Sequence, residues 1–351
     1  MTAKLSPASI RAHFDSMRES VGRRPQPPRR FSRPDSHGPR TLGGAGSQDV
    51  AAMLFRQSER VWIAQAPAKV NLGLRILGRR PDGYHQLDTV MARVSLCDTL
   101  VVETVSSTEL RLRVRLAYPP ALAGEPIPET SDNLVLRAAE LLRQRSGAAL
   151  GARITLVKRI PAAAGLGGGS SDAATALVVL NRAWNLRLST EELSSHATEL
   201  GSDVPFFLTS AVYARCTGRG ERVQPLPVCV RLPLVLARPH AGLSTAAVYR
   251  RCQPAPSDRS IDRLIAALRE GDVREAARHL QNGLQEPAEE LSEDILRLKA
   301  EFARLPVGGH QMTGSGSAYF GVCRSPRQAK ECAARLKARG IPAVWNVSTC
   351  A

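Results

Sequence analysis

The chain contains 351 residues, 43% of them hydrophobic and 23% charged, which is typical of a folded globular protein with room for two domains. It holds no apolar run of the roughly 20 residues that a membrane span needs, so an integral membrane protein is excluded. Forty-eight basic and 32 acidic residues give a net charge of +16. This charge favours an anionic partner: nucleic acid, an acidic membrane surface or a phosphorylated small molecule.

The seven cysteines are scattered along the chain, with no Cys-x-x-Cys pair. This spacing argues against a zinc module and against a disulfide framework. It favours free thiols in a reducing cytosol.

The first 60 residues lack the signature of a folded region. Residues 21–40 are rich in Arg, Pro and Ser and show no apolar periodicity. We therefore predict that residues 1–60 form a disordered basic extension. The extension has no apolar segment of the kind a secretory signal needs, and we expect a cytoplasmic, bacterial protein. Its arginines leave organellar targeting and nucleic-acid tethering open, although five acidic residues weaken the targeting interpretation.

From residue 61 onward, apolar and polar residues alternate, which predicts strands. We expect two strands or one bent strand over 61–78, followed by a turn at 79–85 where Pro-Asp-Gly supplies the geometry. The next expected elements are strands at 87–105, 109–118 and 152–160, and helices at 133–145, 170–184 and 189–200.

The later part of the chain is richer in helices. We expect strands at 231–239 and 342–348, and helices at 244–251, 260–269, 273–281, 288–304 and 326–339. Strands first and helices later, with a break near 225–230, predict an α+β protein with two domains, over 61–225 and 226–351.

Residues 161–177 carry the first chemical motif. Four glycines fall within positions 165–169, between a predicted strand and a predicted helix. Glycine lets backbone N–H groups approach a ligand closely, and a helix start adds unpaired donors and the positive end of the helix dipole. The segment predicts a phosphate site, unless it is a glycine-rich loop without a ligand. It lacks the Gly-Lys-Ser/Thr ending of a Walker A loop.

Two charged residues stand out in otherwise apolar segments. Lys69 lies in a predicted strand and needs an anionic partner if it faces inward, but an outward-facing lysine fits the same pattern. Asp203 follows a predicted helix and precedes Val-Pro, where a helix N-cap is the commoner role and a general base the other. A further loop, Thr-Gly-Ser-Gly-Ser at 313–317, can line phosphates with its donors or can be a simple turn.

Four segments taken in order resemble the motifs of the GHMP kinases: APAKVNLGL (66–74), PAAAGLGGGSSDAA (161–174), GSDVPFF (201–207) and MTGSGSAYF (312–320). The resemblance covers about residues 61–351. It implies a domain like the second domain of ribosomal protein S5 joined to a ferredoxin-like domain. It also implies that ATP and the substrate lie in the cleft between the two, with Mg²⁺ as cofactor.

Three markers narrow the resemblance to those GHMP kinases whose acceptor is a cytidyl diphosphate sugar alcohol: RRPDGYHQLDTVM (79–91), the form GLGGGSSDAA of the glycine-rich loop (165–174) and GRGE (218–221). Such an enzyme transfers the γ-phosphoryl group of ATP to the C2 hydroxyl of its acceptor, in the non-mevalonate route to isopentenyl diphosphate. The implied partner is this small molecule, with no nucleic acid and no membrane, and the chain would be a monomer or a homodimer.

The resemblance also implies roles for single residues. Asp203 corresponds to the base that takes the proton from the C2 hydroxyl, and Lys69 to the catalytic lysine that stabilises negative charge beside it. Tyr84 would stack on the cytosine, His85 would hydrogen-bond its edge, and Tyr249 would place a second aromatic ring against it. Asn71 would bind the substrate or orient Lys69, and Thr313 and Gly314 would contact the substrate. The triphosphate would be bound by the residues of the glycine-rich loop: Pro161, Ala162, Ala163, Ala164, Gly165, Leu166, Gly167, Gly168, Gly169, Ser170 and Ser171.

Two features depart from the family pattern or stay open within it. Residues 162–164 are alanines where many relatives have glycine, so the loop should be slightly stiffer. Asp172 either helps to hold Mg²⁺ or favours the first turn of its helix, and we prefer the second role.

Two rival functions remain. The first is a GHMP kinase of the homoserine or mevalonate type. It is disfavoured because its substrate has no nucleobase for the Asp-Gly-Tyr-His segment (82–85) to bind. A basic nucleic-acid-binding protein would show steeply salt-dependent retention on DNA or RNA. The low aromatic content, 4% of the chain, argues against this second rival.

Overall fold

The computed structural model describes residues 54–118, 122, 126–147, 149–253 and 261–350. These residues belong to one compact unit. The predicted extension lies outside the described residues as far as position 53. Its last part differs from the expectation, because β1 (Leu54–Arg56) pairs antiparallel with the start of β2 and the Leu54 side chain packs on the core.

An eight-stranded mixed sheet forms the first layer of the fold. Its central strands are β2 (Val61–Arg79) and β3 (His85–Val105), which pair along almost their whole length, with three register shifts. The sheet runs in the order β1-β2-β3-β5-β4, β6 pairs with both β3 and β7, and β9 adds to β2 in parallel. The remaining strands are β4 (Leu110–Leu116), β5 (Gly151–Lys158), β6 (Tyr213–Gly218), β7 (Arg222–Leu226) and β9 (Gln281–Asn282).

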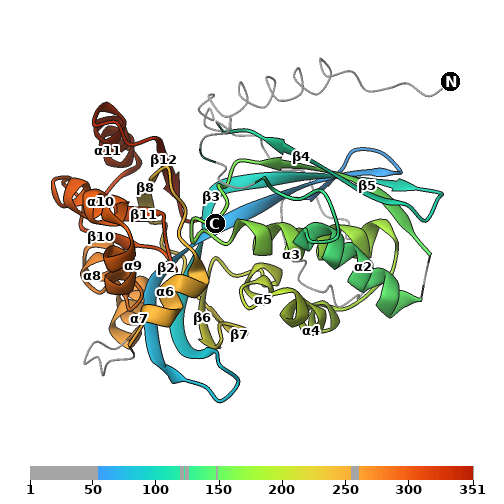
Figure 1. Ribbon diagram of the computed structural model, residues 1–351, viewed down its shortest axis with the longest axis horizontal. Helices are drawn as coiled ribbons and strands as arrows, with labels where there is room; N and C mark the ends of the chain where they lie inside the picture. The colour runs from blue at the N-terminus through green and yellow to red at the C-terminus, as the bar shows by residue number, and fades with distance from the viewer. Residues whose placement is uncertain (1–53, 119–121, 123–125, 148, 254–260, 351) are drawn as a thin grey trace, which may run out of the picture. The chain divides into compact units, whose positions relative to one another are not determined.

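Four helices pack on one face of this sheet: α2 (Leu134–Ser146), α3 (Gly168–Ala183), α4 (Thr190–Leu200) and α5 (Val204–Leu208) (Figure 1). The central helix α3 is buried from Ser171 through Asn181. Its Ala, Leu and Val residues fill the space between the sheet and α2, so the start of α3 is fixed by tight packing.

The second sheet has four antiparallel strands in the order β10-β11-β8-β12. They are β8 (Pro233–Arg238), β10 (Gly309–Met312), β11 (Tyr319–Val322) and β12 (Ala343–Ser348). The helices of this half are α6 (Thr245–Arg251), α7 (Ile261–Glu270), α8 (Val273–Arg278), α9 (Gln285–Leu291), α10 (Glu293–Ala303) and α11 (Pro326–Ala338). The α+β class predicted from the sequence is confirmed.

Three parts of this half differ from the predicted elements. The helix expected over 288–304 is two helices, because the backbone of Ser292 is extended (φ −151°, ψ 113°) between α9 and α10. The helix expected over 273–281 ends at Arg278, and residues 281–282 become β9. Because β9 pairs with β2, the later half of the chain contributes to the first sheet. The domain division at 225/226 stays a prediction.

All seven cysteines are free thiols, as expected. Among the described residues, none of the helices combines the length and the apolar character required to pass through a bilayer.

Candidate active site

A cavity of about 1740 Å³ collects most of the residues that the sequence motifs singled out. Its walls come from β2, from the turn between β2 and β3, from the glycine-rich loop and the start of α3, and from α6. Lys69, Asp203, Tyr84, His85 and Tyr249 all line it. The topology thus brings segments that are far apart in the sequence to one cavity.

Lys69 and Asp203 form an ion pair inside this cavity. The Lys69 Nζ lies 3.3 Å from Asp203 Oδ2, and their side chains are 5% and 29% exposed. The outward-facing alternative for Lys69 is therefore wrong. Asp203 occupies the N-cap position of α5, yet its side chain makes no capping hydrogen bond. Its carboxylate is turned to Lys69, so the N-cap interpretation of Asp203 does not hold.

The short helix α5, which follows Asp203, is held at its other end by a buried arginine. Arg93 is the direct cross-strand partner of Lys69 in the β2–β3 register. Its Nη2 donates to the carbonyl oxygens of Phe206 (3.1 Å) and Phe207 (3.0 Å), and also to that of Thr209. Burial lowers the pKa of Arg93 to about 10, which leaves it charged at neutral pH. Two cations on adjacent strands therefore fix the two ends of α5.

Asn71 orients Lys69. Its Oδ1 accepts a hydrogen bond from Lys69 Nζ (2.7 Å), and its Nδ2 donates to Thr89 Oγ1 (2.9 Å). The Thr313 hydroxyl accepts from the Asn71 backbone N–H (2.9 Å). Thr313 is fully buried and does not line the cavity, whereas Gly314 does. The structure therefore does not support the predicted contact between Thr313 and the substrate. The Thr313 hydroxyl instead holds the backbone of Asn71.

The glycine-rich loop packs directly on the Thr-Gly-Ser-Gly-Ser loop. The Gly165 φ angle is +71°, and a Cβ there would lie 2.2 Å from the carbonyl oxygen of Thr313. The fully buried Arg238, at the end of β8, donates from Nη2 to the Ala162 carbonyl oxygen (3.2 Å). These contacts give the loop a single conformation beside Lys69, whose N–H donates to the Leu166 carbonyl oxygen (2.9 Å).

Helix α3 begins at Gly168, two residues before the predicted start, with Gly167 as N-cap and no side-chain capping bond. Its first N–H groups are thus available to an anion in the cavity. Residues 161–170 line the cavity, but Ser171 does not. It is fully buried because it already lies within the first turn of a helix packed into the core. The expected triphosphate contact of Ser171 is not supported by this position.

We expect Gly165→Ala to destabilise the protein by about 1–3 kcal/mol, because the new methyl group would overlap Thr313 and φ is left-handed. Chemical denaturation measures the loss. Gly78→Ala is the matched control, since a Cβ at Gly78 would meet nothing within 4 Å. Equal stability of the two variants would contradict the packed arrangement of the two loops.

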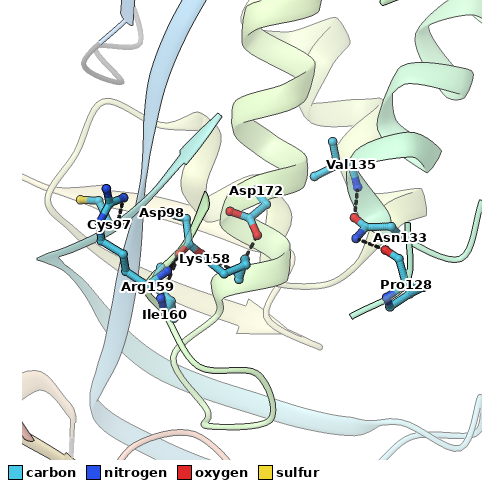
Figure 2. Close-up of polar contacts among 9 residues, drawn as sticks. All are labelled: Cys97, Asp98, Pro128, Asn133, Val135, Lys158, Arg159, Ile160 and Asp172. Atoms are coloured by element: carbon cyan, nitrogen blue, oxygen red, sulfur yellow. Dashed lines mark hydrogen bonds and ion pairs between the residues drawn. The ribbon is translucent and has the colours of Figure 1, made fainter. Parts of the chain in front are cut away.

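Lys158 forms a second, more deeply buried charge cluster with Asp98 and Asp172 (Figure 2). Its Nζ pairs with one carboxylate oxygen of Asp98 and lies 2.7 Å from Asp172 Oδ2. The other Asp98 oxygen accepts from the backbone N–H groups of Arg159 and Ile160. All three charged side chains are almost completely buried. The cluster ties the end of β5 to α3 and to β3.

Asp172 was expected to favour the first turn of its helix, and this expectation is wrong. Since α3 begins at Gly168, Asp172 lies beyond the first turn, with its carboxylate on Lys158. Its Oδ1 has no hydrogen-bond partner among the described residues. Burial raises the pKa of the Asp172 carboxyl, and the Lys158 charge opposes that rise.

The aromatic residues lie at one end of the cavity. Tyr84 is 53% exposed in the turn between β2 and β3, and the rings of His85 and Tyr249 lie 5.1 Å apart at a tilt of 37°. Burial and the nearby Arg79 charge lower the pKa of His85. The imidazole is therefore neutral at neutral pH, when it can donate one hydrogen bond and accept another.

An apolar part of the cavity wall was not predicted from the sequence. Asn133 caps α2 through Oδ1, which accepts from Val135 N–H (3.0 Å), and its Nδ2 donates to the Pro128 carbonyl oxygen (2.8 Å) (Figure 2). These bonds hold the 126–128 segment to the start of α2, and Pro126, Ile127, Pro128 and Leu134 line the cavity together with Leu156 of β5. The sequence offered only an Asn as the first residue of the helix predicted over 133–145, and the structure makes it the N-cap of α2, which begins at Leu134.

Comparison with known proteins identifies the family. Residues 133–211 match the model of the GHMP kinases N terminal domain, and residues 264–342 match that of the GHMP kinases C terminal domain. The 4-diphosphocytidyl-2-C-methyl-D-erythritol kinase of Pelotomaculum thermopropionicum is 41% identical, over 78% of this chain and 93% of that protein.

Solved structures agree. A crystal structure of 4-(cytidine 5'-diphospho)-2C-methyl-D-erythritol kinase superposes with a TM-score of 0.68 at 37% identity, over 82% of this chain and all of that one. The homoserine kinase of Cytophaga hutchinsonii shares the fold (TM-score 0.64, 84% of this chain, 96% of that one) at only 16% identity. The chain therefore belongs to the 4-diphosphocytidyl-2-C-methyl-D-erythritol kinase family within the GHMP kinases.

Proposed function

We propose that this chain transfers the γ-phosphoryl group of ATP to the C2 hydroxyl of 4-diphosphocytidyl-2-C-methyl-D-erythritol. The observation that carries the proposal is the Lys69–Asp203 pair, 3.3 Å apart, in the cavity that also receives the start of α3. Phosphoryl transfer requires alignment and neutralisation of charge more than covalent catalysis. A base, a cation and a set of phosphate donors in one cavity meet that requirement.

In this mechanism Asp203 accepts the proton of the C2 hydroxyl as the oxygen attacks the γ-phosphorus. Lys69 stabilises the negative charge on that oxygen, and Asn71 keeps the ammonium in place through the 2.7 Å hydrogen bond. The backbone N–H groups at the start of α3 bind the triphosphate, since they form the positive end of the helix dipole. The apolar part of the cavity near Leu134 and Leu156 receives the adenine.

The site fits Mg²⁺ bound mainly through the nucleotide. The described residues contain no cluster of three or more His, Cys, Asp or Glu side chains able to hold a metal ion. Mg²⁺ in kinases keeps several waters and takes one or two carboxylates besides the phosphates. Asp172 Oδ1, buried at the cavity wall without a partner among the described residues, suits that single position. The bound ion would neutralise the charge of the phosphates.

A panel of alcohols tests the proposed activity on the full chain. ADP release is measured with 4-diphosphocytidyl-2-C-methyl-D-erythritol, homoserine and mevalonate as acceptors. We expect turnover with the cytidyl acceptor and less than about 1% of that kcat/KM with the other two, a preference worth about 3 kcal/mol. Preferential turnover of homoserine or mevalonate would overturn the substrate assignment but not the kinase chemistry.

Tyr84→Ala tests the proposed cytosine site. Stacking of a base on an aromatic ring is worth about 1–3 kcal/mol, so KM for the cytidyl acceptor should rise about 5- to 100-fold. KM for ATP should stay the same, because Tyr84 belongs to the turn between β2 and β3 and not to the glycine-rich loop. Tyr84→Phe keeps the ring and serves as the control. An equal rise in both KM values would contradict the stacking role.

A further inference from the structure

The turn between β6 and β7, residues 218–221, brings an arginine into the cavity from the side of Asp203. The Arg219 backbone N–H donates to Glu221 Oε2 (2.5 Å), which fixes the conformation of the turn. Gly220 adopts φ +113°, and a Cβ there would lie 3.7 Å from Asp203 Oδ1. The turn is thus a direct neighbour of the reacting carboxylate, and Arg219 lines the cavity.

The Arg219 guanidinium lies over the ring of Tyr84, with Cζ 4.7 Å from the ring centroid. Among the described residues, its N–H groups make no hydrogen bond or ion pair. The neighbouring carboxylates have other partners: Asp82 pairs with Arg80 (3.0 Å), and Glu221 holds the Arg219 backbone. The Arg219 charge adds to that of Arg80 in lowering the pKa of Asp82. A half-buried guanidinium therefore faces the cavity with its donors unused.

We propose that Arg219 binds the diphosphate of the acceptor. The inference rests on the proposed function and adds a residue to it. The acceptor carries its diphosphate between the cytidine and the sugar alcohol. In the cavity, Tyr84 marks the cytosine end and Asp203 the hydroxyl end. Arg219 lies between them in the turn, because the next residue, Gly220, adjoins Asp203 and the Arg219 guanidinium lies over Tyr84. A guanidinium offers paired donors that match phosphate oxygens in a fork geometry.

The kinetic test compares Arg219→Gln, Arg219→Lys and Arg222→Gln in the full chain. A charge-assisted hydrogen bond is worth about 1.5–3 kcal/mol, so Arg219→Gln should raise KM for the acceptor about 10- to 100-fold. KM for ATP and kcat should stay within about twofold. Arg219→Lys should raise KM for the acceptor by less than Arg219→Gln does, because lysine keeps the charge but lacks the paired N–H donors of the guanidinium. Arg222, exposed on β7 and outside the cavity, is the matched control and should behave like the unmodified protein.

A binding experiment separates the diphosphate from the base. The dissociation constants of CDP and cytidine are measured by calorimetry for the unmodified protein and for Arg219→Gln. We expect the preference for CDP over cytidine to fall about 10-fold or more in the variant, with cytidine binding unchanged. Equal loss for both ligands would assign Arg219 to the base instead, and an unchanged preference would remove it from the acceptor site.

The two proposals fail in different ways. If the unmodified protein does not phosphorylate the cytidyl acceptor, the proposed function fails whatever Arg219 does. If it does phosphorylate that acceptor and Arg219→Gln leaves its KM unchanged, only the role of Arg219 is overturned. A rise in KM for ATP with none for the acceptor would place the guanidinium on the nucleotide, which also contradicts the inference.

Discussion

Asp203→Asn is expected to lower kcat by about 10²- to 10⁴-fold, while the affinity for ATP stays within a few-fold. Asparagine has nearly the shape of aspartate but cannot take the proton of the C2 hydroxyl. The carbonyl groups at the C-terminal end of α5 stay bonded to Arg93, and asparagine fills the same space as aspartate at the other end, so the cavity should keep its shape. Steady-state kinetics give kcat, and calorimetric titration gives the ATP dissociation constant.

The control for Asp203→Asn is Asp262→Asn. Asp262, like Asp203, is paired with a cation, here Arg215 (2.9 Å), but it is 71% exposed and does not line the cavity. Its replacement should leave kcat unchanged. If Asp203→Asn keeps activity within tenfold of the unmodified protein, Asp203 is not the base.

Lys158→Met should give the largest loss of stability. Removing the ammonium leaves Asp98 and Asp172 buried together without a cation, and breaking a buried pair in this way typically costs about 3–5 kcal/mol. Urea denaturation of the full chain, followed by circular dichroism, measures the free energy of unfolding. Because the cluster joins β3, β5 and α3, the unfolding midpoint of the whole unit should shift.

Lys299→Met provides a matched comparison with Lys158→Met. Lys299 also pairs with a carboxylate, that of Glu289 (2.8 Å), but it is 46% exposed. Such surface pairs contribute about 0–1 kcal/mol. A loss for Lys158→Met no greater than that for Lys299→Met would show that the buried cluster does not stabilise the fold.

The strands and helices that the sequence predicted well are those with strong periodicity. The alternation in β2 and β3 predicts strands, and the Ala/Leu/Val run of α3 predicts a helix; of the two forms left open for 61–78, the single strand is the one observed. The strands β6 and β7 were missed because Arg215 interrupts the apolar pattern of β6 and Arg222, Gln224 and Pro225 that of β7. The strand β9 has two residues, too few for any pattern, and exists because β2 offers it an edge.

In the candidate site, too, some residues could be identified from the sequence and others could not. Lys69 and Asp203 could be named because their segments resemble a known family. The resemblance could not settle whether Asp203 caps a helix, since that depends on where the side chain turns. The pairing of Lys158 with Asp98 joins positions 60 residues apart, and each lies in a strand that also carries other charged residues, so neither stands out in the sequence. Arg93 likewise looks like any outward-facing arginine until its neighbours are known.

The pairing of Lys69 with Arg93 across β2 and β3 couples assembly of the reaction centre to the alignment of two strands. Side chains alternate between the faces of a sheet, so a slip of one position would turn one of these cations away from α5. Partly folded molecules with misaligned strands would therefore be inactive even if their helices were already formed. Recovery of activity during refolding should accordingly coincide with the last step of sheet formation and not with the earlier gain of helix.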